Sequence, residues 1–467
     1  MTSNNSETAN LWTPDSWRSK PLKQEVQYAD QEKFKASISK LARLPPLVSP
    51  TEIEALKHQL KEAGKGNAFL LQGGDCAELF DYCSQEPIEN KLKVLIQMSL
   101  VLLWGARVPV IRVARMAGQY AKPRSSPIEK IDGQEYPSFR GDNVNGFELD
   151  QREPDPERLV QAYFHSAATL NYVRSIINSG FADLNKPHEW DLSHVRCGAV
   201  REEYQQVVNQ LSNTLDFMKT IKVIGGGNSS SQSLRSVDMF MSHESLMLDY
   251  ESSLTRCLVD PNTGEKKWYN TSGHFLWVGD RTRQLDCAHI EYLSGIANPL
   301  GIKVGPTTDA GDLILLLEKL NPKREEGRIT LITRFGFELI EKCLSTYIKA
   351  VQESGHPVVW VCDPMHGNTE MSSAGVKTRH FANIMGEVGR AFRIHSVCGS
   401  KLNGVHFELT GDSVTECVGG SMELEHHQLN DNYQTYCDPR LNYEQSLDMA
   451  FLIAKYYQRE RTGIQEL

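Results

Sequence analysis

Short runs of apolar and β-branched residues recur along the chain, separated by longer stretches with the spacing of amphipathic helices. The expected strands are Ala68–Leu71, Val108–Val113, Phe275–Val278, Ile302–Val304, Ile329–Ile332, Val358–Val361 and Val405–Leu409. The expected helices between them include Pro87–Trp104, Gly311–Leu320, Phe337–Glu353 and Ala374–Ile394. Because strands that alternate with helices pair in parallel through crossover connections, the pattern predicts an α/β fold.

Seven clear strands are one short of a closed (β/α)8 barrel. We expect the eighth strand at Phe181–Leu184 or at Leu246–Tyr250, and the pattern does not choose between them. The competing fold is an open doubly wound sheet, but no Gly-x-Gly-x-x-Gly follows any of the strands. The sequence therefore favours a (β/α)8 TIM barrel.

Two segments add to this barrel. Residues 1–66 read as a helical extension, in which Ser49-Pro50-Thr51-Glu52 is a capping box that starts a helix ending near Gly64. Residues from about 189 to 243 contain the long helix Val200–Ile221 and a Gly- and Ser-rich linker, which indicates an inserted helical segment. We therefore expect an extension over 1–66 and a catalytic barrel over 67–467 that carries this insertion.

Composition excludes several classes of protein. The 467 residues include 50 Lys and Arg against 59 Asp and Glu, a net charge of -9 that argues against a nucleic-acid partner. The longest apolar stretch, around Ser99 to Val113, is interrupted by Gly, Pro and Arg, so we expect no membrane span. Ten cysteines without a Cys-x-x-Cys pair, and no signal or transit pattern at the N-terminus, predict a cytoplasmic protein with reduced thiols.

Charged and metal-binding side chains lie within or just after the end of nearly every expected strand. They are Asp75, Cys76, Arg112, Arg115, Asp280, Arg281, Lys303, Arg334, Asp363, His366 and Glu408. Since all strand ends of a parallel barrel meet at one face, we expect these residues to converge there and make that face strongly basic.

The acceptor groups in this set suggest a metal site. Cys76, His366 and Glu408, joined by Asp438, supply a thiolate, an imidazole and two carboxylates, which suit a divalent ion such as Mn, Co, Fe or Zn. Their spacing matches no compact metal motif. Each residue also has a structural explanation, as a buried cysteine, a turn histidine or the partner of an arginine.

The basic groups suggest anion binding. Lys122, Arg124 and Ser125 lie on a proline-stiffened loop, where a guanidinium fork and a hydroxyl can hold a phosphate. A solvated basic loop is the alternative. It loses weight because Arg115, Arg281, Lys303 and Arg334 are expected at the same face, and so many cations need anions to relieve their repulsion. Two separate phosphate groups would satisfy them.

Several longer motifs at these positions resemble one enzyme family. They are Leu71-Gln-Gly-Gly-Asp-Cys-Ala-Glu, the segment Arg112 to Ser125, Arg140-Gly-Asp-Asn-Val-Asn-Gly, Asp183-Leu-Asn-Lys-Pro-His-Glu-Trp, Gly279-Asp-Arg-Thr-Arg-Gln-Leu-Asp, Cys362-Asp-Pro-Met-His-Gly-Asn-Thr and Gly404-Val-His-Phe-Glu. They are similar to the type II, plant-like 3-deoxy-D-arabino-heptulosonate 7-phosphate (DAHP) synthases, from about Trp12 to the C-terminal helix. Asp280 departs from the usual Glu of the family, and Cys287 stands where Gly is common.

The resemblance implies a (β/α)8 barrel that condenses phosphoenolpyruvate with D-erythrose 4-phosphate and water, giving DAHP and phosphate at the entry to the shikimate pathway. It implies a divalent metal ion, with Mn first among Mn, Co, Zn and Fe, bound by Cys76, His366, Glu408 and Asp438. The implied phosphoenolpyruvate site is Arg115, Asp280, Arg281, Lys303 and Arg334, and the implied sugar phosphate site is Lys122, Arg124 and Ser125. The implied catalytic groups are Lys303, Arg281, His366 and Asp363, with Asp363 or a bound water handling protons.

Two other functions stay open at this point. A non-catalytic effector-binding protein could use the same fold, but it would be expected to have lost a metal ligand, and all four are present. Another metal-dependent barrel aldolase, or the related eight-carbon sugar-acid synthase, would differ in the loops that measure the length of the aldose. Comparing erythrose 4-phosphate with arabinose 5-phosphate as co-substrate distinguishes these enzymes.

The resemblance also implies regulation and assembly. The extension and the insertion are not needed to close a barrel, and in similar enzymes such additions form subunit contacts and effector pockets. We therefore expect a homodimer or homotetramer inhibited by an aromatic amino acid. If Cys76 and Asp438 bind one ion, Cys437 lies near Cys76. A disulfide between them is then expected in the metal-free protein, where a basic pocket should favour the Cys76 thiolate, unless Cys437 points into the core.

Overall fold

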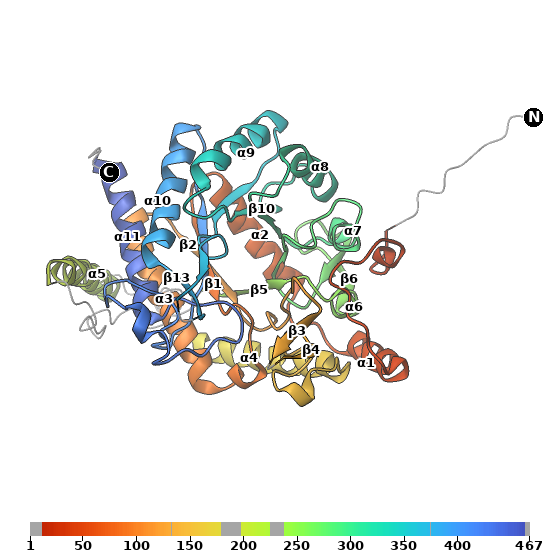
Figure 1. Ribbon diagram of the computed structural model, residues 1–467. Helices are drawn as coiled ribbons and strands as arrows, with labels where there is room; N and C mark the ends of the chain where they lie inside the picture. Colours follow the sequence, from red (N-terminus) through yellow and green to blue (C-terminus); the bar gives the residue numbers. More distant parts are fainter. Residues whose placement is uncertain (1–11, 132, 179–197, 225–237, 374, 463–467) are drawn as a thin grey trace, which may run out of the picture.

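The computed structural model describes residues 12–131, 133–178, 198–224, 238–373 and 375–462, and it confirms the expected barrel. Eight parallel strands close in the order β1-β14-β11-β10-β9-β8-β5-β2 (Figure 1). Their bounds are β1 Phe69–Gly74, β2 Val110–Arg115, β5 Phe240–Glu244, β8 Phe275–Val278, β9 Leu300–Val304, β10 Ile329–Thr333, β11 Val359–Cys362 and β14 Gly404–Glu408.

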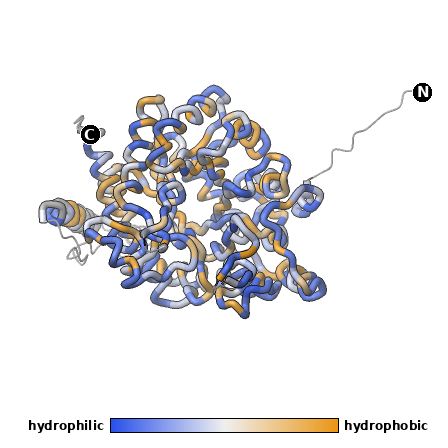
Figure 2. The backbone as a smooth tube through the Cα atoms, in the orientation of Figure 1, coloured by the Kyte–Doolittle hydropathy of each residue, from blue (hydrophilic) through white to orange (hydrophobic). Residues whose placement is uncertain are grey.

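A ring of helices surrounds the strands (Figure 1). It comprises α3 Gln85–Ala106, α4 Glu157–Asn178, α6 Leu248–Ser253, α7 Ala288–Gly295, α8 Ala310–Leu320, α9 Ile340–Ser354, α10 Phe381–Val397 and α11 Tyr443–Thr462. Hydrophobic and hydrophilic positions alternate along these helices, as expected when one face packs on the strands (Figure 2). α3 and α11 approach closely at Gly105, where a Cβ would lie 2.3 Å from Ala454. No helix in the described part of the chain is both long and apolar enough to cross a membrane.

The eighth strand is β5, so the expected location at Leu246–Tyr250 is wrong, because that segment runs into α6. The alternative at Phe181–Leu184 lies outside the described residues. β5 was not recognised from the hydrophobic pattern because it contains polar residues that have buried partners. The Ser242 hydroxyl lies 3.0 Å from the Gln72 amide and 3.0 Å from the Ala114 carbonyl oxygen. The barrel thus resumes at Phe240, inside the range 189–243 expected for the insertion.

The expected helix Ala374–Ile394 also starts later than the pattern indicates. α10 begins at Phe381, because Lys377–Arg379 form β13 and pair with β12, Thr369–Met371, in an antiparallel hairpin. Two further antiparallel hairpins lie outside the barrel sheet. They are β3 Ile128–Ile131 with β4 Gln134–Pro137, and β6 Thr255–Val259 with β7 Lys266–Asn270. Short 3-10 turns lie at Ser16–Ser19, Phe80–Tyr82, Leu149–Gln151 and His426–Gln428.

The N-terminal extension closes one end of the barrel. It contains α1, Gln31–Arg43, and α2, Pro50–Gly64, whose predicted capping box is present: the Ser49 amide donates to Glu52 at 2.8 Å. Leu56, Leu60 and Ala63 of α2 belong to the hydrophobic cluster that fills the barrel interior. The Asn403 amide donates to the Ala63 carbonyl oxygen at 2.7 Å, just before β14. α2 therefore plugs the amino end of the strands and leaves the carboxyl end open.

The long helix expected in the insertion is α5, Gly198–Ile224. It lies outside the ring of helices, next to α11 (Figure 1). The rings of Tyr204 and Phe451 stack there at a centroid distance of 3.9 Å. The Gly- and Ser-rich linker that follows α5, and the Asp183 motif that precedes it, lie outside the described residues.

Candidate active site

The carboxyl ends of the strands surround a cavity of about 310 Å³. Its lining includes the sequence-predicted residues Cys76, Arg115, Lys122, Arg124, Ser125, Asp280, Arg281, Lys303, Arg334, His366 and Asp438. Two further predicted residues, Asp363 and Glu408, are fully buried and directly contact that lining. Residues that are far apart in sequence therefore converge at one face, as the strand topology requires.

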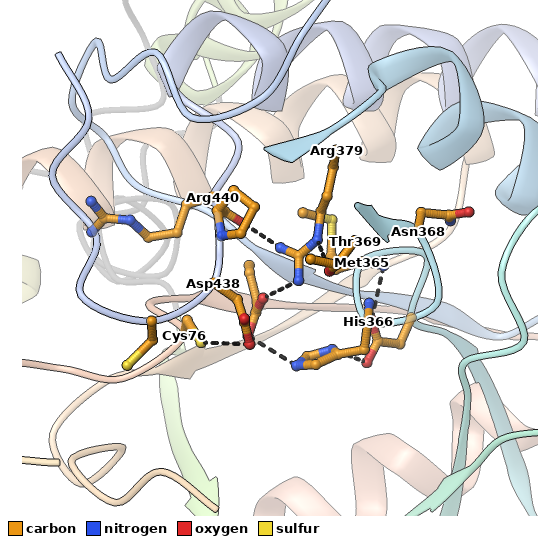
Figure 3. Close-up of polar contacts among 12 residues, drawn as sticks. Cys76, Met365, His366, Asn368, Thr369, Arg379, Asp438 and Arg440 are labelled. Carbon is orange, nitrogen blue, oxygen red and sulfur yellow. Dashed lines mark hydrogen bonds and ion pairs between the residues drawn. The ribbon is translucent and has the colours of Figure 1, made fainter. Parts of the chain in front are cut away.

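Four of these side chains form a cluster of sulfur, nitrogen and oxygen donors. The ligand atoms of Cys76, Glu408 and Asp438 lie within 4.8 Å of one another. Nε2 of His366 joins them at 3.0 Å from Oε1 of Glu408. In the close-up, Cys76, His366 and Asp438 point toward a common centre (Figure 3).

The ammonium group of Lys122 lies inside this cluster. Nζ of Lys122 lies 2.7 Å from Sγ of Cys76 and 2.6 Å from Oδ2 of Asp438. The Lys122 charge holds the pKa of Asp438 far below its usual range, even though burial opposes this. One thiol, one imidazole and two carboxylates that enclose a positive charge are a donor set that fits a borderline divalent metal ion.

Glu408 stays ionised although it is fully buried. Burial alone would raise its pKa, but His366, Arg379 and Arg115 together hold the pKa well below the usual range. Arg379 approaches the second carboxylate oxygen at 2.8 Å, and Arg115 approaches the first at 3.1 Å. These contacts fix the carboxylate and leave Oε1 directed at His366.

Asp363 connects the cluster to the basic side of the cavity. Its carboxylate accepts from Nδ1 of His366 at 2.7 Å and forms a short ion pair with Lys303. Burial would raise the pKa of Asp363, but His366 and Lys303 hold it well below the usual range. Burial lowers the pKa of Lys303 to about 8, against the opposing charge of Asp363. An ionised Asp363 thus orients both the imidazole and the ammonium group.

Asp280 lies between two arginines at the far wall of the cavity. Its carboxylate is 3.4 Å from Nη1 of Arg334 and 3.0 Å from Nη2 of Arg283. Arg281, the neighbouring residue, is exposed and lines the cavity. The shorter side chain at position 280 therefore still reaches Arg334.

The loop after β2 is held from outside the barrel. The Arg124 amide donates to Oε1 of Gln24 at 2.8 Å, and the Gln24 side-chain amide donates to the Arg124 carbonyl oxygen at 3.0 Å. The Arg124 guanidinium pairs with Glu129 at 2.8 Å. Ser125 is exposed at the rim. Lys122 and Arg124 were expected to act together. Lys122 instead points into the cluster of sulfur, nitrogen and oxygen donors, whereas Arg124 lies at the edge of that cluster.

Four residues of the site were not predicted from the sequence: Glu244, Gln119, Lys377 and Arg379. Glu244 ends β5, the unrecognised strand, and among the described residues its buried Oε1 has no hydrogen-bond partner. Burial raises the pKa of Glu244, against nearby positive charges that include Lys122 and Lys303. Gly279 leaves room for it, because a Cβ there would lie 2.1 Å from Oε1. The Gln119 side chain accepts from the Glu244 backbone amide at 2.7 Å.

The other two, Lys377 and Arg379, lie on β13, in a segment expected to be helical. Lys377 reaches Asp438 at 3.2 Å. A three-residue strand rich in charge carries no hydrophobic signal from which it could have been recognised.

Two charged residues expected at this face point elsewhere. The Arg112 guanidinium donates to the Ser99 hydroxyl at 2.7 Å, on α3. The buried Asp75 carboxylate pairs with Lys91 and, at 2.9 Å, with Arg440. Both residues therefore stabilise the ring of helices and loops, and neither lines the cavity.

Cys437 lies next to Cys76, and both are free thiols. The expectation that the pocket favours the Cys76 thiolate is wrong, because burial raises the pKa of Cys76 and the neighbouring carboxylate of Glu408 adds to this. A hydrogen bond with Cys76 lowers the pKa of Cys437.

Comparison with known proteins identifies the family. A model of the class-II DAHP synthetase family matches residues 12–454. The phospho-2-dehydro-3-deoxyheptonate aldolase of Neurospora crassa is 53% identical over 462 residues, covering 96% of this chain and 95% of that protein. The protein of the same name from Streptomyces coelicolor is 47% identical over 445 residues, covering 95% and 97%.

Among solved structures, the phospho-2-dehydro-3-deoxyheptonate aldolase of Francisella tularensis aligns over 93% of this chain and 98% of its own, at 13% identity and a TM-score of 0.45. The family assignment rests on the sequence matches, which span nearly the whole chain and confirm the resemblance and enzyme class expected from the motifs. The chain belongs to the class-II DAHP synthetase family of enzymes.

Proposed function

We propose that this protein condenses phosphoenolpyruvate with D-erythrose 4-phosphate and water to give DAHP and inorganic phosphate, the first step of the shikimate pathway. The observation that carries the proposal is the cavity at the strand ends, where cationic side chains flank a cluster of Cys76, His366, Glu408 and Asp438. Two phosphorylated substrates need two cationic subsites, with a polarising centre between them.

We propose that the cluster binds one divalent metal ion, with Mn as the first candidate before Co, Zn and Fe. The support is the donor set and the Lys122 ammonium group held between Cys76 and Asp438. The ion would supply a Lewis acid that polarises the aldehyde of the sugar phosphate. Two cations do not share the same ligands, so Lys122 would then turn its charge toward the cavity, where an anionic substrate compensates it.

Phosphoenolpyruvate is assigned to the side of the cavity formed by Arg115, Asp280, Arg281, Lys303 and Arg334. Arg115 is fully buried and fixed by Glu408 and the Cys76 carbonyl oxygen, so it presents a positioned charge. Lys303 and the arginines stabilise the phosphate that leaves carbon 2. Asp280 keeps Arg334 in place.

The sugar phosphate is assigned to the loop after β2. Arg124 and Ser125 stand at the rim, and Lys122 stands between them and the cluster. In this arrangement the phosphate of the four-carbon sugar is held remote from the reacting aldehyde, so binding energy positions the aldehyde next to carbon 3 of phosphoenolpyruvate.

Proton transfer is assigned to groups around Lys303. Because Asp363 is ionised and holds both His366 and Lys303, its proposed role is orientation rather than proton donation. Glu244 has a raised pKa and a buried oxygen without a hydrogen-bond partner among the described residues. Besides a bound water, Glu244 is therefore a candidate for accepting the proton of the water that attacks carbon 2.

Phosphate release with both substrates, measured before and after chelation, tests this proposal. We expect release only when phosphoenolpyruvate and erythrose 4-phosphate are both present, with loss on chelation and recovery on adding Mn²⁺. Equal activity with arabinose 5-phosphate would favour the eight-carbon sugar-acid synthase instead. The absence of phosphate release under all conditions would favour a non-catalytic effector-binding protein.

Location and assembly are part of the proposal as well. All cysteines of the described residues are free, which suits a reducing compartment and supports a cytoplasmic location. A homodimer or homotetramer that is inhibited by an aromatic amino acid is supported by the extension and by α5, neither of which contributes a strand to the barrel.

A further inference from the structure

A second group of metal-ligating side chains lies outside the active-site cavity. Glu370 of β12, His380 just before α10 and His426 of the 3-10 turn at 426–428 bring one ligand atom each within 4.8 Å of one another. Nε2 of His380 is 2.8 Å from Oε1 of Glu370, and the rings of His380 and His426 meet edge to face at 5.1 Å. None of the three lines the cavity or contributes to the cluster around Cys76.

Backbone hydrogen bonds hold two of these segments together. The Phe381 amide donates to the Val418 carbonyl oxygen at 2.8 Å, and the Val418 amide donates to the Arg379 carbonyl oxygen at 2.9 Å. The Gly419 amide donates to the Leu424 carbonyl oxygen at 2.8 Å, which turns the chain back toward His426. The segment around His426 is thereby tied to the segment around His380.

Further backbone and capping contacts fix the positions of Glu370 and His426. Glu370 pairs with Thr378 across the β12–β13 hairpin, two residues before His380. A capping box between Glu425 and Gln428 fixes the turn that begins at His426. Little backbone freedom remains to be lost when an ion binds, and this preorganisation favours binding.

We propose that Glu370, His380 and His426 form a second divalent-metal site, separate from the active site and selective for ions of the Zn²⁺ class. Two imidazoles and one carboxylate suit Zn²⁺, Co²⁺, Ni²⁺ or Cu²⁺, whereas Mg²⁺ and Ca²⁺ prefer sites made of oxygen alone. Metal–ligand bonds of about 2.1 Å place tetrahedral ligand atoms about 3.4 Å apart. The Glu370–His380 distance of 2.8 Å would therefore open by about 0.6 Å, and the other separations, which are at most 4.8 Å, would close by no more than about 1.4 Å. Rotamer adjustment permits these movements, because the His380 and Glu370 side chains are 36% and 42% exposed.

The location ties this site to the hairpin that serves the active site. On the same hairpin, Arg379 reaches Glu408 at 2.8 Å and Lys377 reaches Asp438 at 3.2 Å. An ion on Glu370 and His380 would anchor the outer side of β12–β13. The inference does not depend on the proposed reaction, because it uses none of the residues assigned to it.

The test is a zinc-binding stoichiometry on chelated, full-length protein, measured by isothermal titration and by metal analysis after gel filtration. Wild type should bind one more Zn²⁺ per chain than His426→Ala, and also one more than Glu370→Gln. The matched control is His427→Ala: His427 is exposed and pairs with Glu425 instead of joining the set. This variant should bind as many ions as wild type. Thermal melting confirms that each variant is folded.

The difference between wild type and His426→Ala decides the question whatever the active site does. Equal stoichiometry in these two proteins overturns the proposal, and so does the loss of one ion from His427→Ala. If the active site binds no metal, wild type would bind one ion and His426→Ala none, so failure of the proposed function stays distinguishable. Co²⁺ adds a second readout: the outer site lacks sulfur, so the spectrum lost in His426→Ala must contain no thiolate charge-transfer band.

Discussion

At the residue scale, the position of a charged residue along its strand predicts whether its side chain reaches the active-site face. A charged side chain at or near the carboxyl end of an apolar run is expected at the open face of a parallel barrel, and Arg115, Lys303 and Arg334 lie there. The rule fails for Arg112, which sits inside β2 rather than at its end and points toward α3. Glu244 follows the rule but lies on a strand too polar to be recognised.

Loss of a metal ligand should remove metal and activity without unfolding the barrel. In Cys76→Ser and His366→Ala we expect metal affinity and kcat each to fall by about 100-fold or more, because the donors act as a set. The barrel core is separate from the ligand layer, so the melting temperature of the metal-free protein should change little. Metal analysis, phosphate release and thermal melting measure the three quantities.

Cys287→Ser is the control, since Cys287 is buried but lies outside the cavity. Full activity of Cys76→Ser or His366→Ala at low metal concentration would contradict the ligand assignment.

Arg124 should act on one substrate only. Its guanidinium is assigned to the phosphate of erythrose 4-phosphate, so Arg124→Ala removes a charge-assisted contact worth roughly 1.5 to 3 kcal/mol. We expect KM for erythrose 4-phosphate to rise about 10- to 100-fold while KM for phosphoenolpyruvate stays constant. Lys130→Ala, an exposed cation on the adjoining β3, serves as the control in steady-state kinetics. An increase confined to phosphoenolpyruvate would mean that the two phosphate subsites are reversed.

Oxidation of the metal-free enzyme should join Cys76 and Cys437. The two thiols are neighbours, and the pKa of Cys437 is lowered, so Cys437 supplies the attacking thiolate. Bound metal should protect, because it occupies Cys76. Disulfide mapping by mass spectrometry after mild oxidation checks this, with Cys437→Ser as control. Inactivation of Cys437→Ser as fast as wild type, or no bridge in the oxidised protein, would leave Cys437 without a redox role.

At the element scale, strongly amphipathic helices were predictable and short polar strands were not. α8 and α9 fall within three residues of their expected bounds, because a wide apolar stripe must face the barrel. β5 was missed because only Phe240 and Met241 are apolar and its remaining residues are polar, and β13 was missed because it contains no apolar residue. The same reason hid Lys377 and Arg379 from the site.

Residues 20–28, the strap that links the first 3-10 turn to α1, should set affinity for the sugar phosphate. Gln24 brackets the Arg124 backbone with two hydrogen bonds, and Arg140 donates to the Glu25 carbonyl oxygen at 2.7 Å. The Lys122 amide in turn donates to the Arg140 carbonyl oxygen at 2.8 Å. The strap therefore holds both cations of the loop after β2.

We expect Gln24→Leu to raise KM for erythrose 4-phosphate several-fold, with kcat and KM for phosphoenolpyruvate unchanged. Gln24→Glu keeps only the hydrogen-bond acceptor, so its KM for erythrose 4-phosphate should lie between the values of wild type and Gln24→Leu. Gln27→Leu, an exposed position on the same strap, is the matched control. A uniform drop in kcat for Gln24→Leu would show general destabilisation instead of positioning.

At the scale of the whole molecule, the closed barrel, the plug formed by α2 and the open carboxyl end explain why one face carries the chemistry. The additions to the barrel predict assembly and control. We expect a dimer or tetramer by light scattering, and inhibition of phosphate release by phenylalanine, tyrosine or tryptophan. A monomer that is indifferent to all three would contradict this expectation.

The most direct test of the central claim is the stoichiometry of phosphate and DAHP formed by the purified protein. With phosphoenolpyruvate and erythrose 4-phosphate we predict one phosphate per DAHP, no release from phosphoenolpyruvate alone, loss of both products after chelation and their recovery with Mn²⁺. Phosphate release that needs no erythrose 4-phosphate, or that survives complete removal of metal, would contradict the account.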